Sequence, residues 1–181
     1  NIESWLPFDN YVDCSNTVDG KPIYYWINKT AKTVPSDAGI VILVNSTDIT
    51  VKDLVLPLST YSIILFNTNQ SMIENNRLAP QNPEQLDYYH TPGVPMQVLL
   101  LNSSNNQLKA NYATLWLNFS PTNTLTDNTG VFRLNGSDDN LIANNTITKI
   151  GFVANDWSGI VLTHSANNTI ICNEISGNSA G

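Results

Sequence analysis

A six-residue pattern recurs along the chain. Its first position is aliphatic, its fourth is usually Asn, its sixth is usually aliphatic, and the other three positions vary. The copies begin at Val51, Ile73, Leu108, Ile142 and Ile170. An apolar run precedes each copy and ends beside a polar residue, in turn Asn45, Asn67, Asn102, Asn135 and His164. The interval from that polar residue to its copy is constant, except that it is one position longer in the fourth repeat. Two landmarks that keep phase five times indicate an internal repeat.

The copies are unequally spaced, with Val51 and Ile73 the closest pair, and each unit offers two or three short apolar strands separated by Asn-rich turns. Such a unit cannot bury its own apolar face, whereas stacked units bury a continuous core. The chain holds 26 Asn and only 13% charged residues, so turn formers are abundant and good helix formers scarce. We therefore predict one all-β domain, a parallel β-helix of about five coils.

The same pattern predicts how Asn stabilises the stack. Asn tolerates the left-handed backbone of a tight bend, and its amide can hydrogen-bond to the coils above and below. We expect two such ladders. One comprises Asn45, Asn67, Asn102 and Asn135, and the other comprises Asn76, Asn111, Asn145 and Asn173.

The residues outside the repeats predict a cap and three loops. Residues 1–38 precede the first clear coil and are rich in aromatic residues, so we expect an N-terminal cap that seals the core. Residues 39–181 should form the coils, with insertions at 79–95, 114–129 and 148–157. All three insertions follow the same point of the repeat and should emerge on one flank.

The stretch from Ser158 to Asn178, SGIVLTHSANNTIICNEISGN, resembles the right-handed parallel β-helix repeats of NosD-type proteins. The segments Asp19–Trp26 and Val34–Gly39 are similar to those that often precede such repeats in surface proteins of methanogenic archaea. The resemblance implies a right-handed β-helix outside the cytoplasm. The family label also suggests copper, but no His, Met or Cys cluster has ligand spacing, since His90, His164, Met72, Met96 and the two Cys are scattered. We expect no metal and no cofactor.

Three functions stay open. The first is a non-catalytic structural module of an archaeal envelope, sheath or filament, which self-assembles through stacked coil ends or lateral loops, because the last coil lacks an evident cap. The second is a carbohydrate-binding module that uses insertion residues Tyr88, Tyr89, Trp116, Asp156 and Trp157. The third is a polysaccharide-degrading enzyme with acidic candidates Asp127, Asp138, Asp139 and Asp156. Asp is a common turn former and adjacent residues point apart, so we predict no catalytic residue.

The composition indicates which binding partners and which cellular compartment suit the chain. The net charge of −7 argues against nucleic acid, and no apolar stretch is long enough to span a membrane. Eight Asn-x-Ser/Thr sequons suit an extracellular surface, and we expect glycans at Asn28, Asn69, Asn118 and Asn167. Cys14 and Cys172 are either free thiols or an intermolecular disulfide across a junction between copies.

Overall fold

The computed structural model describes residues 10–57, 61–78, 97–148 and 158–178, which form β-strands joined by short turns, with no helix among them. An eight-stranded sheet forms one side of the molecule, and we call it the first wall. Its order is β1 (Thr17–Val18), β2 (Lys21–Ile27), β4 (Ile40–Val44), β7 (Ile63–Phe66), β10 (Gln97–Leu101), β12 (Thr114–Asn118), β15 (Phe132–Asn135) and β18 (Ile160–Thr163).

A seven-stranded sheet faces it and is called the second wall. In chain order it contains β3 (Thr30–Thr33), β5 (Thr47–Lys52), β8 (Met72–Glu74), β11 (Gln107–Lys109), β13 (Thr124–Thr126), β16 (Leu141–Ala143) and β19 (Thr169–Ile171). Shorter strands form a third side, where β6 (Val55–Leu56) pairs with β9 (Arg77–Leu78) and where β14 (Thr129–Gly130), β17 (Thr146–Ile147) and β20 (Glu174–Ile175) form a sheet.

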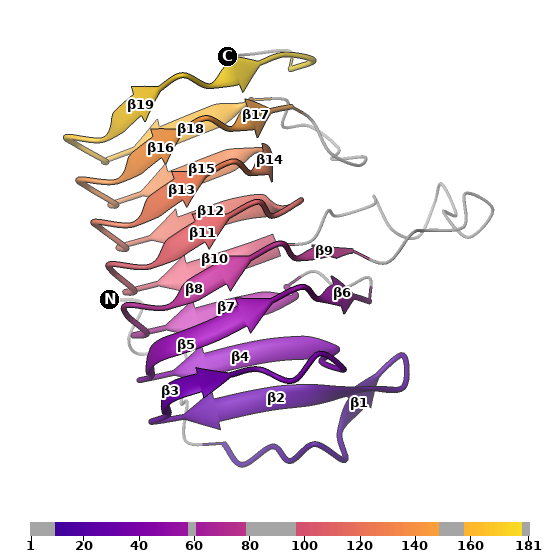
Figure 1. Ribbon diagram of the computed structural model, residues 1–181. Coiled ribbons are helices and arrows are strands. Elements are labelled where there is room, and N and C mark those ends of the chain that lie inside the picture. Colours follow the sequence, from indigo (N-terminus) through magenta and orange to yellow (C-terminus); the bar gives the residue numbers. More distant parts are fainter. Residues whose placement is uncertain (1–9, 58–60, 79–96, 149–157, 179–181) are drawn as a thin grey trace.

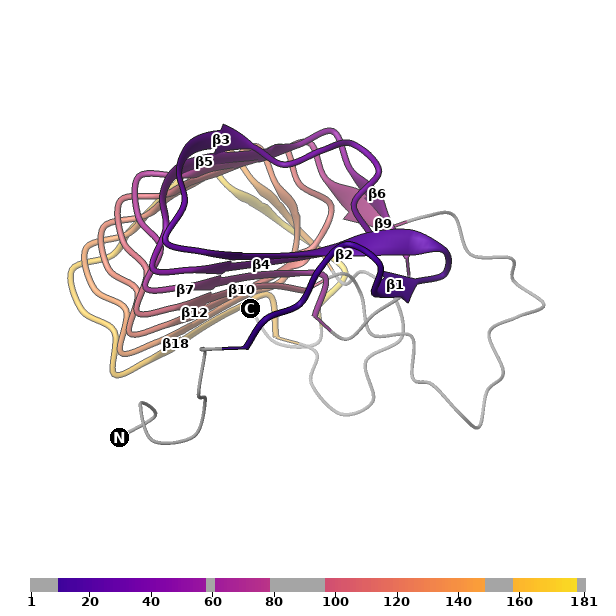
Figure 2. The same cartoon turned by 90° about the horizontal axis from the view of Figure 1, so that it is seen from below.

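The strands stack as successive coils. Every strand pair of the described residues is parallel except β1 with β2, and the chain crosses the first wall, the second wall and the third side in turn (Figure 1). Viewed along the stack from the N-terminal coil, the chain runs clockwise as it recedes, which is a right-handed winding (Figure 2). The prediction of a right-handed parallel β-helix is confirmed.

The predicted insertion at 114–129 is wrong, because this segment forms a complete coil in the middle of the stack. Coil-to-coil hydrogen bonds there join positions whose numbers differ by 17. Strands β12, β13 and β14 pair in register with the neighbouring coils, so 114–129 belongs to the stack. This coil does not fit the repeat pattern because Gly130 stands where the pattern has an aliphatic residue. The repeats that begin at Leu108 and Ile142 are therefore separated by a whole coil and not by a loop.

The first wall consequently holds seven parallel strands from the described residues, which gives seven coils instead of five. The other expected insertions, 79–95 and 148–157, lie outside the described residues except for Thr148.

The boundary of the N-terminal cap is also corrected. Strands β2 and β3 lie within the predicted cap of 1–38, yet they pair in parallel with β4 and β5 and form the first coil. Their side chains Tyr24 and Trp26 pack against the core with ring centroids 6.0 Å apart. Tyr11, in contrast, is 91% exposed, and Trp5 and Phe8 lie outside the described residues.

The core consists of aliphatic columns that run along the stack. Alternate residues of a strand point inward, so Leu43, Leu65, Leu100, Leu117 and Leu134 come from five consecutive coils and are all almost fully buried. Burial of each such side chain stabilises the fold by about 2 kcal/mol. The outward side chains Val44, Leu99 and Leu101 are also at most 9% exposed. Burial on both faces explains why these strands read as continuous apolar runs.

The last described coil has a neighbour on one side only. Its inward-facing residues Leu162, Ile170 and Ile175 are therefore 42%, 42% and 47% exposed, although the equivalent residues of the preceding coils are buried.

Candidate functional site

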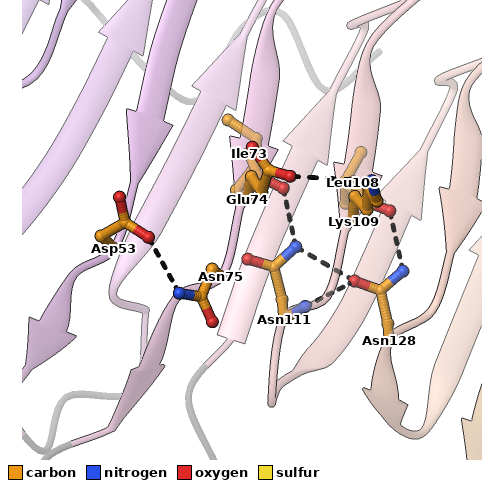
Figure 3. A network of polar contacts seen from close by, with 8 residues as sticks. All are labelled: Asp53, Ile73, Glu74, Asn75, Leu108, Lys109, Asn111 and Asn128. Atoms are coloured by element: carbon orange, nitrogen blue, oxygen red, sulfur yellow. Dashed lines mark hydrogen bonds and ion pairs between the residues drawn. The ribbon is translucent and has the colours of Figure 1, made fainter.

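A ladder of buried Asn side chains joins the coils on the inner side of the turn that follows the second wall. The Asn111 Oδ1 accepts from the backbone N–H and the Nδ2 of Asn76 at 3.1 and 2.9 Å. The Asn111 Nδ2 donates to Ile73 O at 2.8 Å and to Asn128 Oδ1 at 3.0 Å (Figure 3). The amide thus makes four hydrogen bonds inside the protein and links its own coil to the coils on both sides.

The same contacts continue through Asn145 and Asn173. The Asn128 Nδ2 donates to Asn145 Oδ1 at 3.1 Å, and the Asn145 Nδ2 donates to Asn173 Oδ1 at 2.9 Å. The structure therefore links the four residues expected for this ladder, Asn76, Asn111, Asn145 and Asn173, and adds Asn128 between them. Asn128 lies 17 positions from each neighbour, a spacing that the sequence contained but that was hidden by the supposed insertion.

A second buried Asn ladder and a Ser/Thr ladder were missed entirely. The second Asn ladder follows the turn between the two walls and joins Asn106, Asn123, Asn140 and Asn168. The Ser/Thr ladder runs beside it through Ser46, Thr68, Ser103, Ser120, Ser137 and Ser165, where each hydroxyl after the first accepts from the backbone N–H of the previous rung. The Ser or Thr that recurs directly after each turn residue was the available signal.

The other expected ladder, Asn45–Asn67–Asn102–Asn135, differs from the prediction. Asn45, Asn67 and Asn102 lie in the outer turn after the first wall with φ of 47–49°, and all three are exposed. Only the Asn67 Nδ2 to Asn45 Oδ1 contact, at 2.8 Å, is made between them. Asn135 pairs with Asn118 at the end of a strand, and Gly136 occupies the turn position instead. The longer interval in that repeat reflects this one-position offset.

This outer turn column contains Asn28, Asn45, Asn67, Asn102, Phe119, Gly136 and His164, all with positive φ. Asn and Gly adopt this backbone readily, whereas a bulky aromatic residue does not. Phe119 has φ 49° and is 50% exposed. Its ring lies over Gly136, where an added Cβ would come within 2.7 Å of Phe119 Cδ1. Gly136 thus makes room for the ring.

Of the expected carbohydrate site, only Trp116 lies among the described residues, and its predicted place in a loop is wrong. Trp116 lies within β12 on the outward side of the first wall, paired with Leu99 and Arg133, and is not part of a loop. The other four residues, Tyr88, Tyr89, Asp156 and Trp157, lie outside the described residues.

The four expected glycosylation sites differ in accessibility. Asn28 and Asn167 are exposed in turns, and Asn118 is half-buried at the end of β12. The Asn69 Oδ1 accepts from the backbone N–H and the Oγ of Ser104 at 2.7 and 3.0 Å, so the oxygen of its amide is hydrogen-bonded to the next coil.

Acidic side chains of the described residues serve local structure. Asp127 and Asp139 occupy left-handed turn positions, and Asp138 accepts from the Ala166 N–H at 2.6 Å. The Tyr24 hydroxyl donates to Asp37 at 2.9 Å, and partial burial followed by this hydrogen bond raises the pKa of Tyr24 above its ordinary value.

Among the described residues, the side chains that could bind a metal do not come together. Across 10–57, 61–78, 97–148 and 158–178 no three His, Cys, Asp or Glu residues cluster to hold a metal. Met72 lies in the third coil of the stack, whereas His164 and Cys172 lie in the seventh, where His164 follows β18 and Cys172 follows β19. The described residues therefore do not fit a copper site, and His90 and Met96 lie outside them. Cys14 and Cys172 are free and exposed.

Comparison with known proteins identifies the family. A family model described as periplasmic copper-binding protein (NosD) matches residues 8–181, so the chain belongs to the NosD family of β-helix repeat proteins. No curated protein and no solved structure matches the chain. No helix in the described part of the chain is long and apolar enough to cross a membrane.

Proposed function

We propose that this chain is a non-catalytic structural module that works outside the cytoplasm, in a cell envelope, sheath or filament. The observation that carries the proposal is the set of three ladders that hold consecutive coils in one register. Each rung is hydrogen-bonded, as in the four contacts of Asn111, and the rungs before the last described coil are buried. Buried polar networks that are fully satisfied rigidify a fold, and rigidity is what a structural module needs.

Family and composition support the location. The NosD family description is of a periplasmic protein, which favours a place outside the cytoplasm for this chain. The chain carries only 13% charged residues, a net charge of −7 and eight sequons, a composition that suits an extracytoplasmic surface. The sheath or filament is the finer part of the proposal.

The direction of the ladders bears on how copies would assemble. Each Ser or Asn oxygen accepts from the preceding coil, so a coil stacked on the last one must supply oxygen acceptors at these positions. In the first coil the equivalent positions are Lys29, whose N–H donates to Ser46 Oγ, and Lys32, which pairs with Ile49. A lysine side chain accepts no hydrogen bond. The first coil therefore does not offer the side-chain acceptors that would continue these two ladders from the last described coil.

Fractionation of the native cells tests the proposal. An antibody against this chain should detect it in the envelope fraction, in particles larger than one chain, with a cytoplasmic enzyme as the control for leakage. Immunogold labelling of native envelopes should show the chain in ordered arrays. Recovery in the cytoplasmic fraction, or as a monomer in intact envelopes, would overturn the proposal.

A further inference from the structure

We propose that the corner around Phe119 binds a neutral carbohydrate. We call this surface the Phe119 platform, and it comprises Asn102, Asn118, Phe119, Asn135 and Gly136. All five belong to three consecutive coils and lie at or beside the outer turn after the first wall. The proposal is independent of the envelope role.

The aromatic part of the platform is the ring of Phe119. It is 50% exposed and rests on Gly136, where a Cβ would come within 2.7 Å of Cδ1 and 2.8 Å of Cε1. The backbone of the next coil therefore supports the ring and leaves the rest of it open to solvent. Aliphatic C–H groups of a sugar ring carry partial positive charge and pack on the negative face of an aromatic ring.

The polar part consists of three side-chain amides, and the proposal requires the Asn118 sequon to be unmodified. Asn118 and Asn135 are paired in register on β12 and β15 and point outward, and Asn102 precedes Phe119 in the turn column, with its N–H donating to Asn118 O at 3.0 Å. Within the described structure these three side-chain amides make no hydrogen bond, whereas the ladder Asn residues are saturated. Each amide offers an acceptor and two donors, which matches neighbouring hydroxyl groups of a sugar.

The absence of charged side chains in the Phe119 platform favours a neutral ligand over an anionic one. None of the five platform residues is ionisable, so the platform has no fixed charge with which to hold a uronate or a sulfate. The matching ligand is a neutral sugar, bound by one stacked ring and by amide hydrogen bonds.

The left-handed backbone of Phe119 argues against a role for its ring in packing alone. A non-Gly residue in the left-handed region costs roughly 1–2 kcal/mol, and four of the other turn residues in this column are Asn, which tolerates it. Strain that persists at an exposed site points to function. If the ring only covered Gly136, Asn at 119 would be the better residue.

Calorimetry against neutral hexasaccharides of glucose, mannose and N-acetylglucosamine tests the platform. The intact chain should bind at least one of them. Phe119→Asn should weaken that binding at least tenfold while the circular dichroism spectrum stays unchanged, because Asn suits the turn. Tyr112→Ala removes another 50% exposed aromatic residue, on the third side, and should leave binding unchanged.

Asn135→Ala gives a second readout, since it removes one amide without touching the ring, and binding should fall severalfold. The absence of binding to every probe would overturn the proposal, as would equal affinity of Phe119→Asn and the intact chain. Neither result bears on the envelope role, which rests on cell fractionation.

Discussion

The Asn111 Nδ2 donates to Asn128 Oδ1 at 3.0 Å, and the Asn111 N–H donates to the same oxygen at 2.9 Å, although the two residues lie 17 positions apart in the sequence. One side-chain oxygen therefore satisfies two donors of the preceding coil, in an environment that excludes water. This relationship repeats along both Asn ladders, except that only the backbone N–H of Asn123 donates to Asn140 Oδ1, and it sets the register of the coils.

Removal of one rung should destabilise the fold strongly. Asn128→Ala leaves the buried Asn111 N–H without its acceptor, and it removes the hydrogen bonds from Asn128 Nδ2 to the Leu108 carbonyl at 2.8 Å and to Asn145 Oδ1 at 3.1 Å. Each unsatisfied buried group costs about 1–3 kcal/mol, so we expect a loss of at least about 2 kcal/mol in the free energy of unfolding. Urea unfolding measures it, with Asn135→Ala, on the outer face, as a control that changes little.

Deletion of residues 114–130 should give a folded protein with one coil fewer. The deletion removes the length of one coil and brings Asn106 and Asn140 into adjacent coils, as well as Asn111 and Asn145, so every ladder stays in register. We expect β-sheet circular dichroism and a lower urea midpoint, because one inter-coil interface is lost. Deletion of only residues 119–126 breaks the register and should prevent folding. Equal behaviour of the two deletions would contradict the coil length that the ladder spacing indicates.

Phe119→Asn should stabilise the protein by up to about 1 kcal/mol, because Asn tolerates the left-handed backbone at φ 49° better than Phe does. Differential scanning calorimetry measures the change. A lower melting temperature would show that the packing of the ring outweighs its backbone strain.

Gly136→Ala should destabilise the protein by about 1 kcal/mol or more, because its φ is +57° and the new Cβ meets the Phe119 ring. In Phe119→Asn the ring is gone, so only the backbone part of that cost should remain. A double-mutant cycle measures the difference, and additive effects would contradict the contact.

The Tyr24–Asp37 contact should make stability depend on alkaline pH. The folded pKa of Tyr24 lies above its unfolded value of 10.0, so the contribution is complete below pH 10 and is lost as the pH rises through the folded pKa. Urea midpoints of the intact chain and of Tyr24→Phe should differ at pH 8 and converge at strongly alkaline pH. A constant difference would contradict the prediction.

The stacked coils could be predicted from the sequence because the apolar runs and the Asn turns are both local signals. The contacts of Asn76, Asn111, Asn145 and Asn173 follow from their constant phase. The coil at 114–130 could not be recognised because Gly130 interrupts the aliphatic pattern. The Phe119 platform could not be predicted, since it depends on register between coils, where a one-position offset decides that Gly136 and not Asn135 faces the ring.

Because of the ladders, the number of coils can change during evolution without a change in the contacts between them. Because each rung presents the same donors to one neighbour and the same acceptors to the other, tandem duplication of a segment such as 114–130 introduces no junction that the protein lacks already. A gene encoding such a chain can lengthen or shorten its product in whole steps of one coil. The surface features, such as the ring at 119, can then diverge on copies whose interior never has to be redesigned.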